Sequence, residues 1–225
     1  MSTATISNMA VLWDLDGTLI DSANIHYQAW CEVLAQEGQR LSTQEFATNF
    51  GKRNDEILRQ IFSVDMSAER IENISEKKEQ TYRGMLKTAG LKLLPGAAAW
   101  LERLQATGWQ QALASSAPHA NIDAAFAALG LGKFLNIVVS ADDVGEGKPN
   151  PAVFIEAARR LNISAKQCIV VEDAPAGIEA AKRAGMHSIG VLSEHHSQLS
   201  ADIVVASLEA LPENAFIKLL AQERS

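Results

Sequence analysis

The chain has 225 residues, of which 47% are hydrophobic and 21% are charged. This is ordinary globular composition, and it excludes a disordered or low-complexity chain. Lys and Arg number 20 against 27 Asp and Glu, so the formal net charge is −7 and general affinity for nucleic acid or an anionic membrane is disfavoured.

Two further features bear on the cellular compartment. No apolar stretch approaches the ~18 residues of a membrane-spanning helix, and residues 1–8 carry no Lys or Arg of the kind that begins a targeting segment. Cys31 and Cys168 lie far apart within apolar patterns, which is typical of buried free thiols. We therefore expect a cytoplasmic protein with no membrane or nucleic-acid partner.

Short β-rich runs recur along the chain, and from residue 111 onward helical segments separate most of them. Strands separated by helices are typical of βαβ units. We therefore expect an α/β fold whose core is a Rossmann-like parallel sheet with helices on both faces. The predicted strands, in chain order, are 10–15, 111–114, 137–140, 169–171, 188–192 and 203–205.

One long interval, between residues 15 and 111, contains no predicted strand. We interpret it as a small all-helical cap domain over the strand ends, with limits at 21 and 93. The core domain then comprises 1–20 and 94–225. The helices predicted in the interval are 22–36, a short helix opened by the capping-box pattern Ser42-Thr43-Gln44-Glu45, 54–62 and 68–87.

Polar side chains follow four of the predicted strands. Ligands bind outside the carboxyl ends of the strands in open α/β sheets, so these residues are the candidates for chemistry. Asp14 and Asp16 are two apart on an extended chain, so both carboxylates can face one site. The other candidates are Ser115 and Ser116 after the second strand, Lys148 after the third, and Glu172 and Asp173 after the fourth.

These carboxylates suit a hard divalent cation such as Mg²⁺, with Lys148 and a serine hydroxyl on the remaining phosphoryl oxygens. The chain has no Gly-x-Ser-x-Gly, Cys/His or Walker pattern. An aspartate is then the best nucleophile, attacking phosphorus to give an aspartyl-phosphate. Asp16 can protonate the leaving oxygen and later take a proton from water, provided that its pKa is raised or that it is shielded from the metal.

Four motifs carry a resemblance. They are Asp14-Leu15-Asp16-Gly17-Thr18-Leu19, Ser115, Lys148-Pro149, and Val171-Glu172-Asp173-Ala174-Pro175-Ala176-Gly177. In this order and spacing they resemble the haloacid dehalogenase (HAD) superfamily, and the resemblance covers nearly the whole chain. The helical insertion resembles the α-helical cap of that superfamily, and His26, Ala29 and Trp30 resemble the β-phosphoglucomutase-like subfamily.

The resemblance implies a role for each motif residue. Asp14 is implied as nucleophile and metal ligand, and Asp16 as acid and base with its backbone carbonyl on Mg²⁺. Asp173 is implied as a metal ligand, and Glu172 as a neighbouring carboxylate or alternate metal ligand. The phosphate ligands are implied to be Ser115 and Lys148, with Ser116 beside them.

The departures from the family pattern separate the possible reactions. Asp16 is absent from the dehalogenases and phosphonate hydrolases of the superfamily, so phosphoester chemistry is favoured. The mutase has a Ser-Lys-Asn-type sequence where this chain has Ala117-Pro118-His119, and its cap arginine aligns with Asn54. We expect a Mg²⁺-dependent phosphatase of a small phosphorylated metabolite, such as a sugar or polyol phosphate, and keep a β-phosphoglucomutase-type isomerase as the alternative. An aspartyl-phosphate receiver module is disfavoured, because such modules have only about 120 residues and no cap.

Cap residues are expected to select the small phosphate-ester substrate. The family resemblance places His26 near the cap–core hinge, and Lys52, Arg53 and Asn54 form a loop whose two cations suit an anion. Lys78 is a further candidate, although acidic residues beside it indicate a salt-bridged exposed face. We expect a monomer, with a weak dimer as the alternative. Four histidines lack metal-ligand spacing and receive no role, namely His119, His187, His195 and His196.

Overall fold

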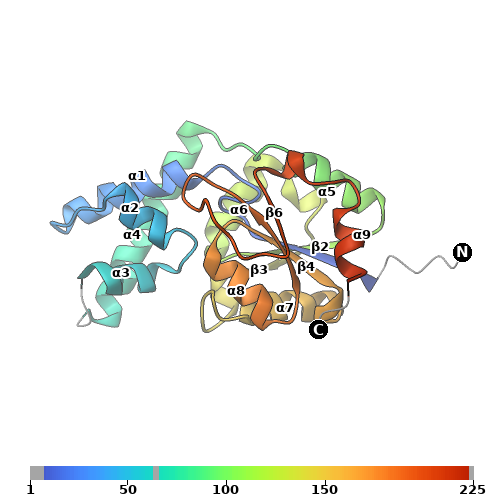
Figure 1. The fold of residues 1–225 in the computed structure, drawn as a ribbon. Helices are drawn as coiled ribbons and strands as arrows, with labels where there is room; N and C mark the ends of the chain where they lie inside the picture. The colour runs from blue at the N-terminus through green and yellow to red at the C-terminus, as the bar shows by residue number, and fades with distance from the viewer. Residues whose placement is uncertain (1–7, 63–65, 223–225) are drawn as a thin grey trace, which may run out of the picture.

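A computed structural model describes residues 8–62 and 66–222. Within them, a six-stranded parallel sheet has the order β3-β2-β1-β4-β5-β6, so that the first strand lies in its middle (Figure 1). The winding reverses between β1 and β4, and open α/β sheets bind their ligands at such a reversal. The strands are β1 Ala10–Trp13, β2 Gln110–Ala114, β3 Ile137–Val139, β4 Cys168–Glu172, β5 His187–Val191 and β6 Ile203–Val205.

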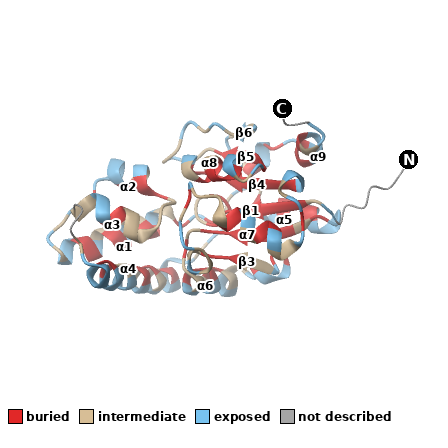
Figure 2. Ribbon diagram, turned by 90° about the horizontal axis from the view of Figure 1, so that it is seen from below, coloured by how far each residue is buried: buried red, intermediate tan, exposed pale blue. Residues whose placement is uncertain are grey.

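The sheet is buried on both faces, because successive residues of β1 enter two different hydrophobic clusters. Val11 and Trp13 pack with α5, α6 and α9, whereas Ala10 and Leu12 pack with α7 and α8. Figure 2 shows the central strands as buried and the outward surfaces of the helices as exposed. The expected α/β fold with a Rossmann-like parallel sheet is confirmed. The covering helices are α5 Ala97–Ala106, α6 His119–Leu129, α7 Ala152–Leu161, α8 Pro175–Arg183 and α9 Ala215–Leu220.

The segment between β1 and α5 forms a separate helical group beside the sheet (Figure 1). Ser42 accepts a hydrogen bond from the Glu45 backbone while the Glu45 carboxylate accepts one from the Ser42 backbone, so the expected capping box is present. The apolar faces of the helices meet in a cluster of their own, which includes Trp30, Phe46 and Ile74. The helices are α1 Ala23–Gln36, α2 Thr43–Asn49, α3 Asn54–Phe62 and α4 Ala68–Ala89.

The two connections between this helical group and the core run side by side. Ile20 and Leu93 form an antiparallel bridge, and the backbone N–H of Asp21 donates to the carbonyl of Lys92 at 3.0 Å. The limits expected from the sequence, at residues 21 and 93, fall at this pair of connections. The division into a cap domain and a core domain stays a prediction.

The element ends differ little from the predicted ones. The largest difference among the strands is at β1, which ends at Trp13, two residues early, because the carbonyl of Leu15 accepts hydrogen bonds from Leu19 and Ile20 and so begins a turn. Both cysteines are free, but only Cys168 is buried, whereas Cys31 is half-buried. Among the helices of the described residues, none combines the length and the apolar character needed to cross a membrane.

Candidate active site

The motif residues meet where β1, β2 and β4 end. Asp14 directly follows β1, and its backbone N–H donates to the carbonyl of Val171 at 3.0 Å. Ser115 directly follows β2, while Glu172 is the last residue of β4. Four segments that are distant in the sequence, including that of Lys148, therefore contribute side chains to one edge of the sheet.

Lys148 lies at the centre of this group and is only 2% exposed. Its ammonium donates to Asp14 Oδ1 at 2.5 Å, to Glu172 Oε1 at 2.7 Å and to the carbonyl oxygen of Ala114 at 3.1 Å. Burial opposes the charge, but Asp14 and Glu172 outweigh burial and raise the pKa of Lys148. The lysine is therefore a fixed positive charge beside the expected nucleophile.

Three buried carboxylates surround this charge. Asp14, Glu172 and Asp173 each offer an oxygen, and these oxygens lie within 4.8 Å of one another. Burial raises the pKa of Asp14 despite Lys148, and it raises the pKa of Asp173 to about 6 despite His196. With all three ionised, three negative charges and one ammonium leave −2, which is the charge that one divalent cation neutralises.

The cluster also has a free ligand atom for such an ion. Asp173 Oδ2 is buried without a hydrogen-bond partner among the described residues, and His196 Nδ1 is 3.9 Å away, beyond hydrogen-bond distance. Gly17 has a φ of 84°, and a Cβ there would overlap the Asp173 carboxylate, so the backbone comes unusually close to it. Hard carboxylate oxygens are the ligands that Mg²⁺ prefers. These residues therefore fit a divalent cation.

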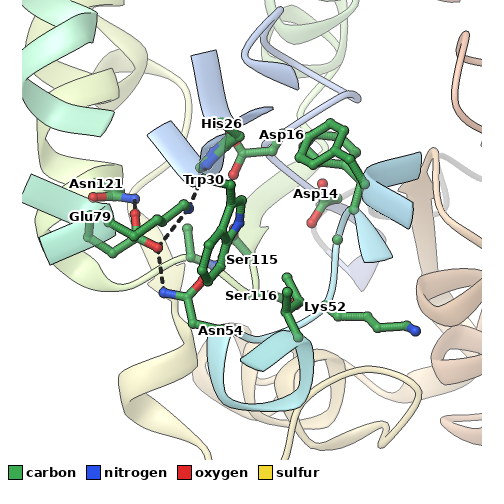
Figure 3. A pocket seen from close by; sticks show the side chains of 16 residues that line it. Asp14, Asp16, His26, Trp30, Lys52, Asn54, Glu79, Ser115, Ser116 and Asn121 are labelled. Carbon is green, nitrogen blue, oxygen red and sulfur yellow. Dashed lines mark hydrogen bonds and ion pairs between the residues drawn. The ribbon is translucent and has the colours of Figure 1, made fainter. Parts of the chain in front are cut away.

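Asp16 is held by the first helix of the inserted group. Its Oδ1 accepts hydrogen bonds from Ser22 Oγ at 2.5 Å and from His26 Nε2 at 3.2 Å. Burial alone would raise the pKa of Asp16, but His26 and Ser22 outweigh burial and lower it. A raised pKa, one of the two conditions set for its acid role, is therefore not found. The carboxylate of Asp16 is directed at His26 and away from Asp14 (Figure 3).

A cavity lies between the inserted helices and the edge of the sheet, and side chains from both parts line it (Figure 3). From the core it is lined by Asp14, Asp16, Ser115, Ser116 and Asn121. From the inserted helices it is lined by His26, Trp30, Lys52, Asn54, Lys78 and Glu79, among others. The inserted helices therefore roof the space above the expected nucleophile.

Lys78 is buried, so the expectation of an exposed face at this position is wrong, although a salt bridge to the neighbouring Glu79 is present. Its ammonium lies 2.8 Å from His26 Nδ1 and 2.9 Å from Glu79 Oε1. The physical reason is helical spacing: Lys78 continues the buried face of α4 that includes Ile74 and Tyr82, at steps of four residues. The ring of Tyr82 in turn stacks on His26, with the ring centres 3.8 Å apart.

The residues of the predicted cap loop point in two directions, some toward the cavity and one toward the core. Asn54 and Lys52 line the cavity, and Lys52 donates to Asn49 Oδ1 at 3.0 Å. Arg53 turns toward the core instead, where its guanidinium donates to the carbonyl oxygens of Val144 at 3.1 Å and Ala141 at 3.4 Å. The two cations of the loop therefore do not act as a pair on one anion.

Two cavity residues were missed by the sequence analysis as site residues. Glu79 accepts hydrogen bonds from Asn54 Nδ2 at 2.6 Å and from Asn121 Nδ2 at 2.5 Å (Figure 3). Glu79 follows Lys78 on a helix whose buried face has a clear period, and that signal was available. Asn121 lies in the first turn of α6, and no pattern around it marks an inward-facing amide.

Comparison with known proteins identifies the family. Residues 9–185 match the model of the haloacid dehalogenase-like hydrolase family. The chain belongs to this family. Its relatives include fructose-1-phosphate phosphatase YqaB of Escherichia coli (strain K12), which is 31% identical over 80% of this chain and 95% of the relative. β-Phosphoglucomutase of Bacillus subtilis (strain 168) is 30% identical over 87% of this chain and 88% of the relative.

A solved structure agrees with the sequence relatives. The β-phosphoglucomutase of Clostridium difficile superposes with a TM-score of 0.85 at 27% identity, over 95% of this chain and 97% of that one. The expected resemblance to the HAD superfamily and its β-phosphoglucomutase-like members is confirmed. The expectation of an enzyme, a phosphoric monoester hydrolase of this superfamily, is confirmed with it.

Proposed function

We propose that this protein is a Mg²⁺-dependent phosphatase of a small phosphorylated metabolite, with a sugar or polyol phosphate as substrate and Asp14 as nucleophile. The observation that carries the proposal is the contact of Asp14 with Lys148 at the base of a cavity roofed by α1–α4. A carboxylate is repelled by a phosphate dianion, so an aspartate attacks phosphorus only where positive charge compensates both groups. The buried ammonium of Lys148 supplies part of that charge.

The ion would be held by Asp14 and Asp173, with Glu172 beside them and the backbone carbonyl of Asp16 as a further ligand. When bound, Mg²⁺ supplies the remaining charge compensation for the carboxylates and the phosphate. Ser115 binds a phosphoryl oxygen, and Ser116 lines the same wall of the cavity. Lys148 binds another phosphoryl oxygen by exchanging one of its three contacts, to Asp14, Glu172 and the carbonyl of Ala114. The chain thereby orients phosphorus in front of Asp14.

The transfer takes two steps. A carboxylate oxygen of Asp14 bonds to phosphorus as the ester P–O bond breaks, and Asp16 donates a proton to the leaving oxygen. Asp16 then takes a proton from water as that water attacks the aspartyl-phosphate, which releases phosphate and restores Asp14. The lowered pKa of Asp16 keeps its carboxylate ionised and free to accept a proton, and an incoming phosphate dianion opposes ionisation and favours the protonated acid.

The cap, proposed as residues 21–93, closes over the substrate and excludes bulk water. Two contacts support this role, because they join the helical group to the core above the cavity. Glu79 accepts a hydrogen bond from Asn121 of α6, and Arg53 donates to the carbonyl of Val144. His26 and Lys78 connect the cap to Asp16 at the same time.

A phosphosugar mutase is the second candidate, and the relatives named β-phosphoglucomutase favour it. A mutase returns the phosphoryl group to another hydroxyl and has to hold a second phosphate in the cap. Here Asn54 donates to the Glu79 carboxylate, so the position that aligns with the mutase arginine faces an acid. This observation supports hydrolysis over transfer.

The test is a screen of phosphorylated sugars and polyols with Mg²⁺, in which released inorganic phosphate is measured. In parallel, β-glucose 1-phosphate is checked for conversion to glucose 6-phosphate. Phosphate release that Asp14→Asn abolishes is the expected result. Formation of glucose 6-phosphate without phosphate release would replace the phosphatase by the mutase. The monomeric state and the cytoplasmic location stay predictions from the sequence.

A further inference from the structure

Glu79 is a buried acid that the proposed mechanism does not use. It lies on α4 at 6% exposure and faces the cavity opposite the catalytic aspartates (Figure 3). Burial alone would raise the pKa of Glu79, but Lys78 and His26, with the hydrogen bond from Asn54, outweigh burial and lower it. Glu79 is therefore a carboxylate acceptor that is ion-paired with the Lys78 ammonium.

The carboxylate of Glu79 can accept one more hydrogen bond besides those that it already accepts. Its Oε1 accepts from Lys78 Nζ at 2.9 Å and from Asn54 Nδ2 at 2.6 Å, while its Oε2 accepts only from Asn121 Nδ2 at 2.5 Å. Each carboxylate oxygen has two lone pairs, so Oε2 retains one acceptor position. The orientation of the Asn121 amide is fixed, because its Oδ1 accepts from the Arg83 guanidinium, which is a donor only.

Lys78 offers a hydrogen-bond donor next to the acceptor of Glu79. Its ammonium has three donors, of which His26 and Glu79 engage two. The third donor and the open acceptor of Glu79 belong to adjacent residues on one helix. A donor beside an acceptor matches the hydroxyl groups of a polyhydroxy alcohol, each of which both donates and accepts.

Among the described residues, the cation in direct contact with Glu79 is already balanced, and Arg83 is separated from Glu79 by the Asn121 amide that it binds. The charge of Lys78 is balanced by the carboxylate of Glu79, 2.9 Å away. Lys52 also lines the cavity, but its side chain runs away from Glu79 and its ammonium donates to Asn49 (Figure 3). A phosphate dianion in contact with Oε2 of Glu79 has no proton to donate, so its oxygens would lie directly against a buried carboxylate oxygen.

We propose that Glu79 is a specificity-determining residue, which accepts a hydrogen bond from a hydroxyl of the leaving alcohol and rejects substrates with a second phosphate. The substrate class is thereby narrowed to monophosphate esters of neutral polyhydroxy alcohols, and bisphosphates are excluded. This inference rests on the proposed phosphatase function.

The experiment compares three substrates by phosphate release: fructose 1-phosphate, fructose 1,6-bisphosphate and p-nitrophenyl phosphate, whose leaving group has no hydroxyl for Glu79 beyond the ester oxygen. We expect the wild type to prefer the monophosphate to the bisphosphate by about 100-fold in kcat/KM. Glu79→Gln keeps the shape of the side chain and removes its charge. It is expected to lower kcat/KM for fructose 1-phosphate about 10-fold more than kcat/KM for p-nitrophenyl phosphate, and to narrow the preference against the bisphosphate about 10-fold.

Two further variants complete the comparison. Glu79→Asp keeps the charge and is expected to retain the rejection of the bisphosphate while losing the hydroxyl contact. Glu76→Gln is the matched control, because Glu76 is exposed and lies one turn earlier on the same helix. This variant is expected to leave kcat/KM unchanged for all three substrates.

The outcomes separate the two proposals. A wild type that releases no phosphate from any of the three substrates contradicts the phosphatase function itself. A wild type that hydrolyses p-nitrophenyl phosphate but treats the two fructose esters alike overturns the role of Glu79 alone. The role of Glu79 is also overturned if Glu79→Gln leaves the ratios of kcat/KM between the three substrates unchanged. A fall of kcat/KM by the same factor for all three substrates has this result, and it is the behaviour of a residue that only supports the fold.

Discussion

His26 Nε2 lies 3.2 Å from Asp16 Oδ1, so a side chain of the inserted helices directly contacts the proposed acid and base of the core. The other ring nitrogen of His26 contacts Lys78, which extends this connection to α4. The position of the cap and the state of Asp16 are therefore linked through one imidazole. A change at His26 is expected to affect chemistry more than binding.

The first prediction concerns this contact. His26→Ala removes a hydrogen bond that orients Asp16, and general acid–base catalysis contributes about 10²–10⁴-fold to such reactions. We expect kcat to fall about 10- to 100-fold with little change in KM, measured by steady-state phosphate release. His119→Ala is the control, because His119 lies outside the cavity contacts and pairs with Asp143. An unchanged kcat in His26→Ala would contradict the proposed orientation of Asp16.

The second prediction separates the role of Asp14 in turnover from its effect on the stability of the folded protein. Burial raises the pKa of Asp14, so its ionised form destabilises the metal-free fold above the ordinary pKa of aspartate. Asp14→Asn is therefore expected to abolish turnover and, in EDTA at pH 7, to melt at the same temperature as the wild type or higher. Calorimetry checks this, with exposed Asp123→Asn as the control. Retained turnover would remove Asp14 as nucleophile, and a large fall in melting temperature would contradict the account of its burial.

The third prediction concerns the metal. EDTA is expected to abolish activity and Mg²⁺ to restore it, because three buried carboxylates around one lysine lack compensating charge. Asp173→Asn is expected to raise the Mg²⁺ concentration for half-maximal activity at least about 10-fold. Mg²⁺ also stabilises the folded state by mass action if it binds there. A thermal shift with Mg²⁺ that persists in full in Asp173→Asn would place the ion elsewhere.

The fourth prediction is a pH dependence far from the cavity. Arg160 contacts Asp143 at 2.6 Å and Glu156 at 2.8 Å. Burial would raise the pKa of Asp143, but the hydrogen bonds from Arg160 and Ser140 outweigh burial and lower it, and Arg159 together with Arg160 holds the pKa of Glu156 at about 2. A carboxyl whose pKa is lowered by folding contributes stability above its unfolded pKa and loses it as the pH falls through the folded pKa. Arg160→Met is therefore expected to lower the free energy of unfolding by about 1 kcal/mol at pH 7.

This loss should shrink as the pH falls from about 5 toward 2, because the two carboxyls become protonated in the unfolded chain first and the wild type then loses the stability that their ionised forms contribute. Urea unfolding at pH 7 and at pH 3 measures the difference between wild type and variant. Exposed Arg59→Met is a control. A loss that is equal at both pH values would mean that Arg160 acts through packing and its hydrogen bond to the carbonyl of Val138, and not through charge.

The core of the site was accessible to sequence reasoning for a topological reason. In a parallel sheet all carboxyl ends point the same way, so residues such as Asp14 and Ser115 had to share one edge once the strands were recognised. The helical insertion was equally visible, because helical periods and a capping box replaced the strand pattern between residues 15 and 111. No long-range information was needed for either inference.

The roof of the cavity was less accessible, because cap contacts depend on how two groups of elements pack together. The charge pattern around Lys78 indicated solvent exposure, whereas tertiary packing buried it beside Glu79. Arg53 gave no signal that it would bind core carbonyls. The ring of His195, which had received no role, packs between Phe46 and Phe50 of the inserted helices, 5.4 and 5.5 Å from their centres.

The bridge between Ile20 and Leu93 has an architectural consequence. Because the two ends of the inserted segment are bridged neighbours, a short turn could replace the segment without moving any strand of the sheet. We expect any movement of the inserted helices against the sheet to pivot at these paired connections. We also expect the inserted helices, which line the cavity opposite Asp14, to be exchangeable between related proteins without changing the residues at the strand ends.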